Sequence, residues 1–256
     1  MTRAAHRQDR LNTIARLAEN ASAAESDIAL LLAFLDDPDK QVQRRAAEEL
    51  ARRAQLDPDV LARLTATLAD APPASRWGTT YALALLDPPP RAALPVLLEV
   101  LGHEDADLRW AAATLLLRMK APIADELVRL ATAGSPTQRK MALYCLRDLR
   151  ADSPRAEQAM LAALADGDAG VRLAALSALG SVAVDRATAA RRVSTLVDDP
   201  DNGVRRAAIG TLGELGYRSA EVVELVRRSA SHASDAGLRR AALRAMKRLE
   251  SSPAKS

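Results

Sequence analysis

The sequence predicts an all-α fold in which short helix pairs stack into a solenoid. Ala and Leu together make up 94 of the 256 residues, whereas the chain has six aromatic residues. A core of this length normally draws on large aromatic side chains, so many small, closely packed helices explain the composition better. In addition, one motif recurs about every 33 residues, a period typical of stacked helix-turn-helix repeats.

The repeated motif is an aliphatic residue followed directly by Arg, then by Ala three positions later and by Leu or Met four positions after that. Its first positions, which we call anchors, are 42, 75, 108, 138, 171, 204 and 238. In five copies an Asp stands three residues before the anchor: Asp39, Asp105, Asp168, Asp201 and Asp235. A further copy that starts at Asp9 indicates a half-repeat near the N-terminus.

Each repeat is expected to contain two helices separated by a turn. In the first helix apolar residues recur at helical spacing, as in Leu31, Phe34 and Leu35. A turn such as Asp37-Pro38 follows, and the second helix begins near the Asp before the anchor, which can cap its free N–H groups. Prolines at 58, 122 and 154 stand between repeats and suit the first turn of the next helix. No segment alternates with period two, so we expect no sheet.

These boundaries predict one domain over residues 1–256. It comprises an N-terminal capping helix in 1–25, seven repeats in 26–250 and a flexible tail in 251–256. The Ala column lets neighbouring helices approach closely, and the Leu column fills the seam between repeats. Stability should then be close to a sum of nearest-neighbour terms.

The Asp-x-x-Val-Arg-x-x-Ala core in repeats 3, 5, 6 and 7 resembles the HEAT family, in the short form related to phycobilin-lyase subunits and artificial helical-repeat binders. Repeats 2 and 4 depart from it at Ser75 and Gln138. The resemblance covers nearly the whole chain. It implies a right-handed α-solenoid of about seven HEAT-like helix pairs plus an N-terminal half-repeat. It also implies that second helices line the concave side and that the Asp and Arg columns form a ladder between adjacent repeats.

Composition excludes several classes of protein. No apolar run is long enough to span a membrane, and the N-terminus lacks the apolar stretch of a secretory signal. A single cysteine cannot form a disulfide framework and fits a reducing compartment, so we expect a cytoplasmic protein. The formal net charge of +3 does not by itself demand a nucleic-acid partner.

The residues that could carry chemistry form no recognisable catalytic pattern, and phosphate-binding and dinucleotide fingerprints are absent. The histidines, at positions 6, 103 and 232, lie far apart. His103-Glu104 resembles the His-Glu pairs of deoxyhypusine hydroxylase, a HEAT di-iron enzyme, but that chemistry needs several pairs. Cys145 stands in a column of small apolar residues with no nearby base. We expect no catalysis, metal or cofactor.

The positions 2, 3, 6 and 10 after each anchor should face the concave side if the HEAT register holds. Four of the six aromatic residues fall in these columns, all in repeats 2 to 4, and positive charge gathers at the two ends of the groove. Exposed aromatic clusters suit binding hot spots, although the rings would alternatively fill gaps in a curved solenoid. The candidate partner-binding residues are Trp77, Tyr81, Trp110, Tyr144, Arg44, Arg118, Lys140, Arg240 and Arg244.

The leading functional hypothesis is a noncatalytic scaffold or assembly adaptor that holds a protein or peptide on its concave face. Nucleic-acid binding is the alternative, because HEAT-like alkylpurine DNA glycosylases grip a duplex in a basic groove and use aromatic residues beside an Asp. Trp77, Trp110 and Tyr144, with Asp148 one turn on, resemble that layout. A glycosylase-like or bilin-lyase-like role ranks lower, since no motif of either family can be matched residue by residue.

Overall fold

The fold is an α-solenoid of helix pairs, as predicted. The computed structural model describes residues 3–20, 24–70, 73–119, 122–151, 153–232 and 235–251. These residues form fifteen α-helices and two short 3-10 helices, and they contain no β-strand. The chain divides into two compact units, residues 1–121 and 122–256. Across the described ranges, no helix has the length and apolar character needed to cross a membrane.

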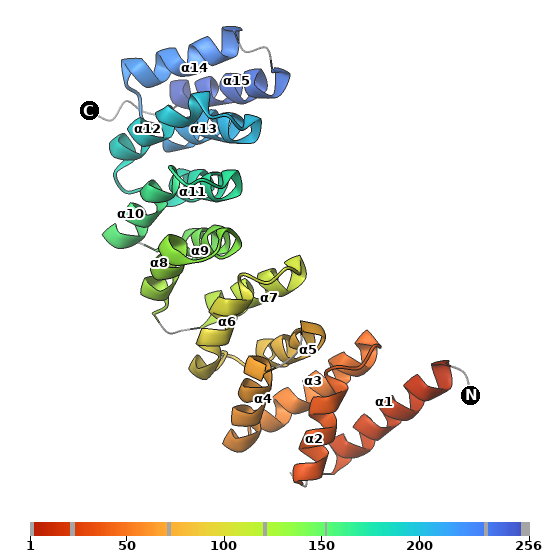
Figure 1. Cartoon of the computed structure of the whole chain (residues 1–256). Helices are drawn as coiled ribbons and strands as arrows, with labels where there is room; N and C mark the ends of the chain where they lie inside the picture. The colour runs from red at the N-terminus through yellow and green to blue at the C-terminus, as the bar shows by residue number, and fades with distance from the viewer. Residues whose placement is uncertain are drawn as a thin grey trace. The chain divides into compact units, whose positions relative to one another are not determined.

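The first unit contains a single helix followed by three helix pairs (Figure 1). Its helices are α1 (Arg3–Glu19), α2 (Glu25–Phe34), α3 (Lys40–Ala54), α4 (Pro58–Asp70), α5 (Pro73–Ala84), η1 (Arg91–Ala93), α6 (Leu94–Val100) and α7 (Ala106–Arg118). The second helices of the pairs, α3, α5 and α7, pack one against the next, and α1 packs against α3. Helix α1 therefore occupies the place of a second helix, as the half-repeat predicts.

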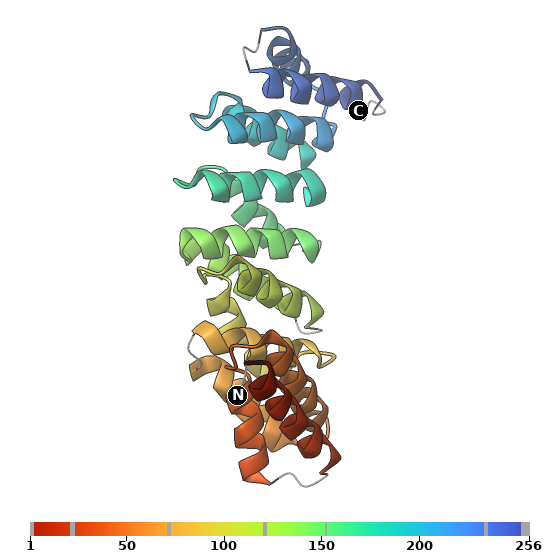
Figure 2. The same cartoon turned by 90° about the vertical axis from the view of Figure 1, so that its right-hand side faces the viewer.

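The second unit contains four helix pairs. Its helices are α8 (Ala124–Ala133), α9 (Pro136–Asp148), α10 (Pro154–Ala163), α11 (Ala169–Val182), α12 (Arg186–Ser194), η2 (Thr195–Asp198), α13 (Asn202–Leu215), α14 (Ala220–His232) and α15 (Ala236–Ser251). Figure 2 shows its second helices, α9, α11, α13 and α15, stacked side by side in chain order. The right-handed sense of the superhelix stays a prediction.

The columns of the sequence motif form the core. The Ala column is fully buried at Ala46, Ala112, Ala142, Ala175, Ala208 and Ala242. These small side chains allow neighbouring second helices to approach closely. The backbones come close at Gly213 of α13, where an added Cβ would lie 2.7 Å from the Cα of Ala245 in α15. The positions that the sequence motif assigned to the contact between repeats are therefore the positions that pack there in the structure.

The aspartates before the anchors cap the second helices, as predicted. Asp168 accepts a hydrogen bond from the Val171 N–H at 3.0 Å, and Asp201 accepts one from the Val204 N–H at 2.9 Å. Asp39, Asp105 and Asp235 act in the same way. Repeat 4, which has no Asp there, uses a capping box in which Ser135 and Gln138 each satisfy the backbone N–H of the other. The weaker motif therefore still starts its helix correctly.

Arginines of the repeated motif do link adjacent repeats, as the resemblance to the HEAT family implies. Their partners, however, are not the aspartates three residues before the anchors, so that part of the expectation is wrong. Arg139 donates two hydrogen bonds to Asp166, at 2.7 and 2.8 Å. Arg172 donates one to Asp199 at 2.8 Å. Each aspartate lies 27 residues after its arginine and two residues before the capping Asp. The earlier carboxylate of the turn, which also accepts the N–H of the capping Asp, is the one that reaches the preceding repeat.

The link between Arg172 and Asp199 is largely shielded from solvent. The side chains of Arg172 and Asp199 are 11% and 4% exposed. Burial alone would raise the pKa of Asp199, but the hydrogen bonds from the Arg172 guanidinium and the Asp201 N–H, together with the charges of Arg172 and Arg205, outweigh it and hold that pKa below its usual range. The column also holds the turns: Arg172 donates to the carbonyl oxygens of Asp166 and Gly167 before its own helix, and Arg205 donates to those of Asp199 and Pro200. The arginine column therefore serves two structural purposes.

Candidate binding surfaces

A groove of about 470 Å³ lies between α13 and α15. We call it the arginine groove; it is lined by Arg206, Ala207, Gly210, Glu214, Gly237, Arg240, Ala241, Arg244, Ala245 and Arg248. All of these except Gly237 and Ala245 stand 2, 3, 6 or 10 positions after the anchors at 204 and 238. In these two repeats, the four columns singled out from the sequence face one common space.

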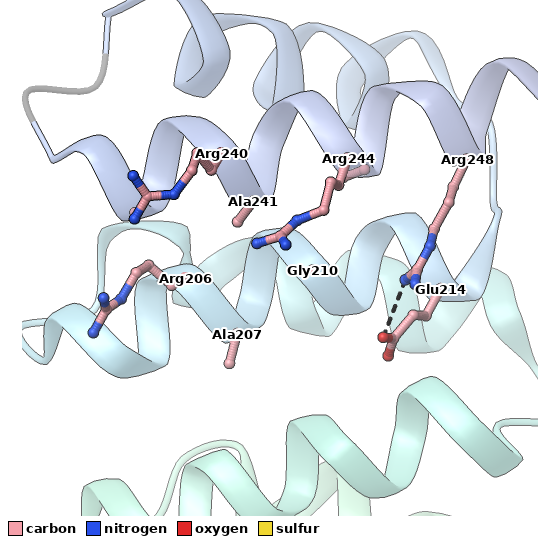
Figure 3. Close-up of a pocket in the computed structure, with 10 residues that line it drawn as sticks. Arg206, Ala207, Gly210, Glu214, Arg240, Ala241, Arg244 and Arg248 are labelled. Atoms are coloured by element: carbon pink, nitrogen blue, oxygen red, sulfur yellow. Dashed lines mark hydrogen bonds and ion pairs between the residues drawn. The ribbon is translucent and has the colours of Figure 1, made fainter.

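The groove carries more positive charge than its own acids neutralise. Arg248 donates a hydrogen bond to Glu214 at 3.1 Å, and Arg206 donates one to the Asn202 carbonyl at 3.2 Å. Within the described part of the chain, neither Arg240 nor Arg244 pairs with an acidic side chain. Figure 3 shows both projecting from α15 on the side where Arg206 stands on α13, with small residues between them.

The first unit carries an aromatic surface, which we define as Trp77, Tyr81 and Trp110. The Trp77 and Tyr81 rings stack with centroids 5.4 Å apart and planes 4° from parallel, as their spacing of four along one helix predicts. Both rings are half-buried. Trp110 stands on the neighbouring helix α7 and is 49% exposed. The described structure therefore does not bury the two indoles in the core.

Lys40, which the sequence analysis did not single out, places a cation beside this surface. The Lys40 ammonium, at the start of α3, lies 4.1 Å from the centroid of the Trp77 ring. A cation over an indole face is attracted by the ring quadrupole, which helps to fix the orientation of Trp77. Because Lys40 and Trp77 are 37 positions apart and belong to different columns, only the packing of α3 on α5 reveals the contact.

The other candidate residues have varied surroundings. Arg44 is exposed on α3, and Lys140 is half-buried on α9. Arg118 donates hydrogen bonds to the carbonyl oxygens of Ala84 and Leu86 at the end of α5, so its guanidinium holds two repeats together. Tyr144 stands on α9 in the second unit. That Tyr144 forms one patch with Trp77, Tyr81 and Trp110 stays a prediction.

Arg147 lies over the Tyr144 ring, with its guanidinium carbon 5.0 Å from the centroid. The same guanidinium donates hydrogen bonds to Asp148 and to Ser177 of the next repeat, each at 2.8 Å. Asp148 is therefore engaged by a neighbouring arginine. Tyr144 and Asp148, which resembled part of a glycosylase site in the sequence, therefore surround an arginine that links two repeats through Ser177.

The two other residues with possible chemistry have structural roles. Cys145 is buried, and burial, assisted by the nearby Asp148 charge, raises the pKa of its thiol to about 12. A thiol with that pKa stays protonated at neutral pH and is a poor nucleophile. The His103 Nδ1 accepts a hydrogen bond from the Asp105 N–H at 3.0 Å, which shapes the turn before α7. No group of metal-binding side chains occurs in the described ranges.

Comparison with known proteins supports the repeat assignment. The family model for HEAT repeats matches residues 28–117 and 189–255, together more than half of the chain. YibA of Escherichia coli is 16% identical over 98% of this chain and 98% of that chain, with a TM-score of 0.58. An engineered protein is 19% identical over 89% of this chain and 69% of that chain, with a TM-score of 0.48.

A designed armadillo repeat protein is 16% identical over 86% of this chain and 98% of that chain, with a TM-score of 0.44. No curated protein matches the sequence. Identities this low establish a common fold with YibA and nothing about its activity. Because the family model covers most of the repeats and the buried columns follow the HEAT register, the chain belongs to the HEAT-repeat family.

Proposed function

We propose that this protein is a noncatalytic scaffold or assembly adaptor that binds a protein or peptide through the inner face of its second helices. The observation that carries the proposal is the aromatic surface. Trp110 is about half exposed on α7, and the stacked Trp77–Tyr81 pair stands on α5, the helix that packs against α7. Tryptophan and tyrosine dominate binding hot spots, and large aromatic rings left at a surface mark interaction sites.

The arrangement of the pair favours recognition of a partner. Stacking on Tyr81 and the Lys40 cation both restrict the Trp77 ring before any partner arrives. A ring that is already oriented loses less conformational entropy on binding, so more of its contact energy contributes to affinity. A noncatalytic role is consistent with the structural use of Cys145 and His103.

A direct test is selection of peptides from a random displayed library on the full chain, followed by affinity measurement. The two tryptophans of the sequence both belong to the aromatic surface, so their fluorescence reports binding there. We expect Trp110→Ala and Trp77→Ala each to weaken selected peptides by about 30-fold, as for a hot spot of about 2 kcal/mol. Their helical circular-dichroism spectra should match that of the unaltered protein.

Leu56→Ala is the matched control, because Leu56 is a 77% exposed apolar residue of the same unit that lies in the turn after α3. It should leave peptide affinity unchanged. Selected peptides that bind Trp110→Ala as tightly as the unaltered chain would contradict the proposal. Loss of the fold in either tryptophan variant would show that the rings are part of the core.

A further inference from the structure

We propose that the arginine groove is a second binding site, which takes an extended acidic segment of a partner protein. This site lies in the second unit and does not depend on the aromatic surface. Among the described residues, its lining contains four arginines and one glutamate, so this part of the groove is positively charged. A ligand that enters it must supply negative charge at several points along its length.

The guanidinium groups are available for carboxylates. Arg240 and Arg244 have no acidic partner among the residues that the structure describes, and both are exposed. The nearby Asp235 carboxylate is used as a cap and accepts the Leu238 N–H at 2.6 Å. That hydrogen bond, together with the Arg206 charge, holds the pKa of Asp235 below its usual range. Arginine binds carboxylates with two parallel hydrogen bonds, which gives strength and directs the ligand.

The spacing of the arginines matches an extended peptide. Arg240, Arg244 and Arg248 follow one another at intervals of four along α15, which corresponds to a rise of about 6 Å per step. Alternate side chains of an extended strand project to the same side about 6.6 Å apart. A segment with an acidic residue at every second position therefore presents one carboxylate to Arg240 and the next to Arg244 as it runs along α15 toward the Arg248–Glu214 pair.

The floor of the groove allows the ligand backbone to come close. Ala207, Gly210 and Ala241 lie between the arginines and add little bulk (Figure 3). An added Cβ on Gly210 would meet no atom within 4 Å, so the space above this residue is open. Filling that space from Gly210 changes the groove without disturbing the packing beneath it.

The same lining disfavours nucleic acid. Sites for single strands combine positive charge with aromatic side chains on which bases stack, and no aromatic residue is among the described residues that line this groove. Glu214 pairs with Arg248 at one end of the groove, so the positive charge without an acidic partner in the described structure covers a short stretch of α15.

Fluorescence anisotropy with the full chain tests the proposal. The probe is a labelled twelve-residue peptide of alternating Glu and Ser, compared with the same peptide carrying Gln in place of Glu and with a twelve-nucleotide oligothymidylate. We expect saturable binding of the Glu peptide and at least about tenfold weaker binding of the Gln peptide. Arg240→Glu with Arg244→Glu should weaken the Glu peptide by about tenfold or more, and Gly210→Leu should weaken it without a change of charge.

The charge-matched control is Arg192→Glu with Arg228→Glu, two exposed arginines on the first helices α12 and α14 that do not line the groove. This control should leave the affinity within about twofold of the unaltered protein if the groove is the site. Equal losses in the two double variants would show that only net charge matters, which would overturn the proposal. Absence of Glu-peptide binding, or tighter binding of the oligonucleotide that Gly210→Leu abolishes, would also overturn it.

Discussion

Each unit has a groove between two neighbouring helices of the inner row, α1 and α3 in the first unit and α13 and α15 in the second. The two grooves differ in whether their arginines pair with acidic side chains. The groove between α1 and α3 has a volume of about 550 Å³ and is lined on the α3 side by Gln41, Arg45, Glu48, Glu49 and Arg52. There Arg45 pairs with Glu48 at 2.9 Å, and Arg52 pairs with Glu49 at 2.6 Å. In the arginine groove, Arg240 and Arg244 have no such partner in the described structure.

The difference arises from individual positions in an otherwise shared pattern. Position 6 after the anchor is Glu48 in α3 and Arg244 in α15. A glutamate three residues from an arginine lies on the same helix face and neutralises it locally. Position 7 is Glu49 in α3, where it pairs with Arg52, and Ala245 in α15. Positions 6 and 7 therefore decide whether the arginines of a groove have an acidic partner on their own helix.

The largest effect is expected from the acid that organises the α1–α3 groove. Burial alone would raise the pKa of Glu49, but hydrogen bonds from Arg52 and Arg53 outweigh burial and hold that pKa below its usual range. Glu49→Ala leaves the buried Arg53 without its carboxylate, and we expect a loss of about 3 kcal/mol in the free energy of unfolding. Urea denaturation followed by circular dichroism measures it.

Glu48→Ala is the adjacent control, because the Arg45–Glu48 pair is exposed and should contribute less than about 1 kcal/mol. Similar urea midpoints for Glu48→Ala and Glu49→Ala would contradict the distinction between the buried and the exposed ion pair of this groove.

The ladder of the second unit should give the next largest effect. Arg172→Ala removes the hydrogen bond to Asp199 across the repeat boundary, and we expect a loss of about 1–3 kcal/mol. Arg205→Ala should cost less, because the described partners of Arg205 are the two carbonyls of its own turn. Arg244→Ala, in the open groove, should leave the urea midpoint nearly unchanged. Equal midpoints for the three variants would show that the ladder does not stabilise the stack.

The smallest expected change in stability comes from two glycines of α13, one on the floor of the arginine groove and one in the packed contact between α13 and α15. Gly210→Ala adds a methyl group to open space within a helix and should stabilise the chain by about 0.5–1 kcal/mol. Gly213→Ala, one turn further along α13, should destabilise it, because its Cβ would lie 2.7 Å from the Ala245 Cα. Thermal unfolding compares the two, and stabilisation by both substitutions would mean that α13 and α15 are not tightly packed.

The sequence by itself determined the helix pairs, their register and the columns that share a face. A period of 33 residues phases buried Ala and Leu positions with caps such as Asp168 and Asp201, and packing of small side chains then permits one register. Because exposed columns follow from buried ones, the residues that line the arginine groove were also readable from the pattern, with Arg240 and Arg244 among them.

Only the tertiary structure decided which partners the long polar side chains find. In the folded chain Arg172 pairs with Asp199 and not with the capping Asp201. Arg118 donates to a carbonyl at the end of α5, and the Lys40 ammonium lies over the Trp77 ring. A guanidinium or ammonium on several rotatable bonds reaches acceptors about 30 residues away in the chain. No local periodicity encodes that choice, because it depends on how closely adjacent turns and helix ends approach once the repeats have stacked.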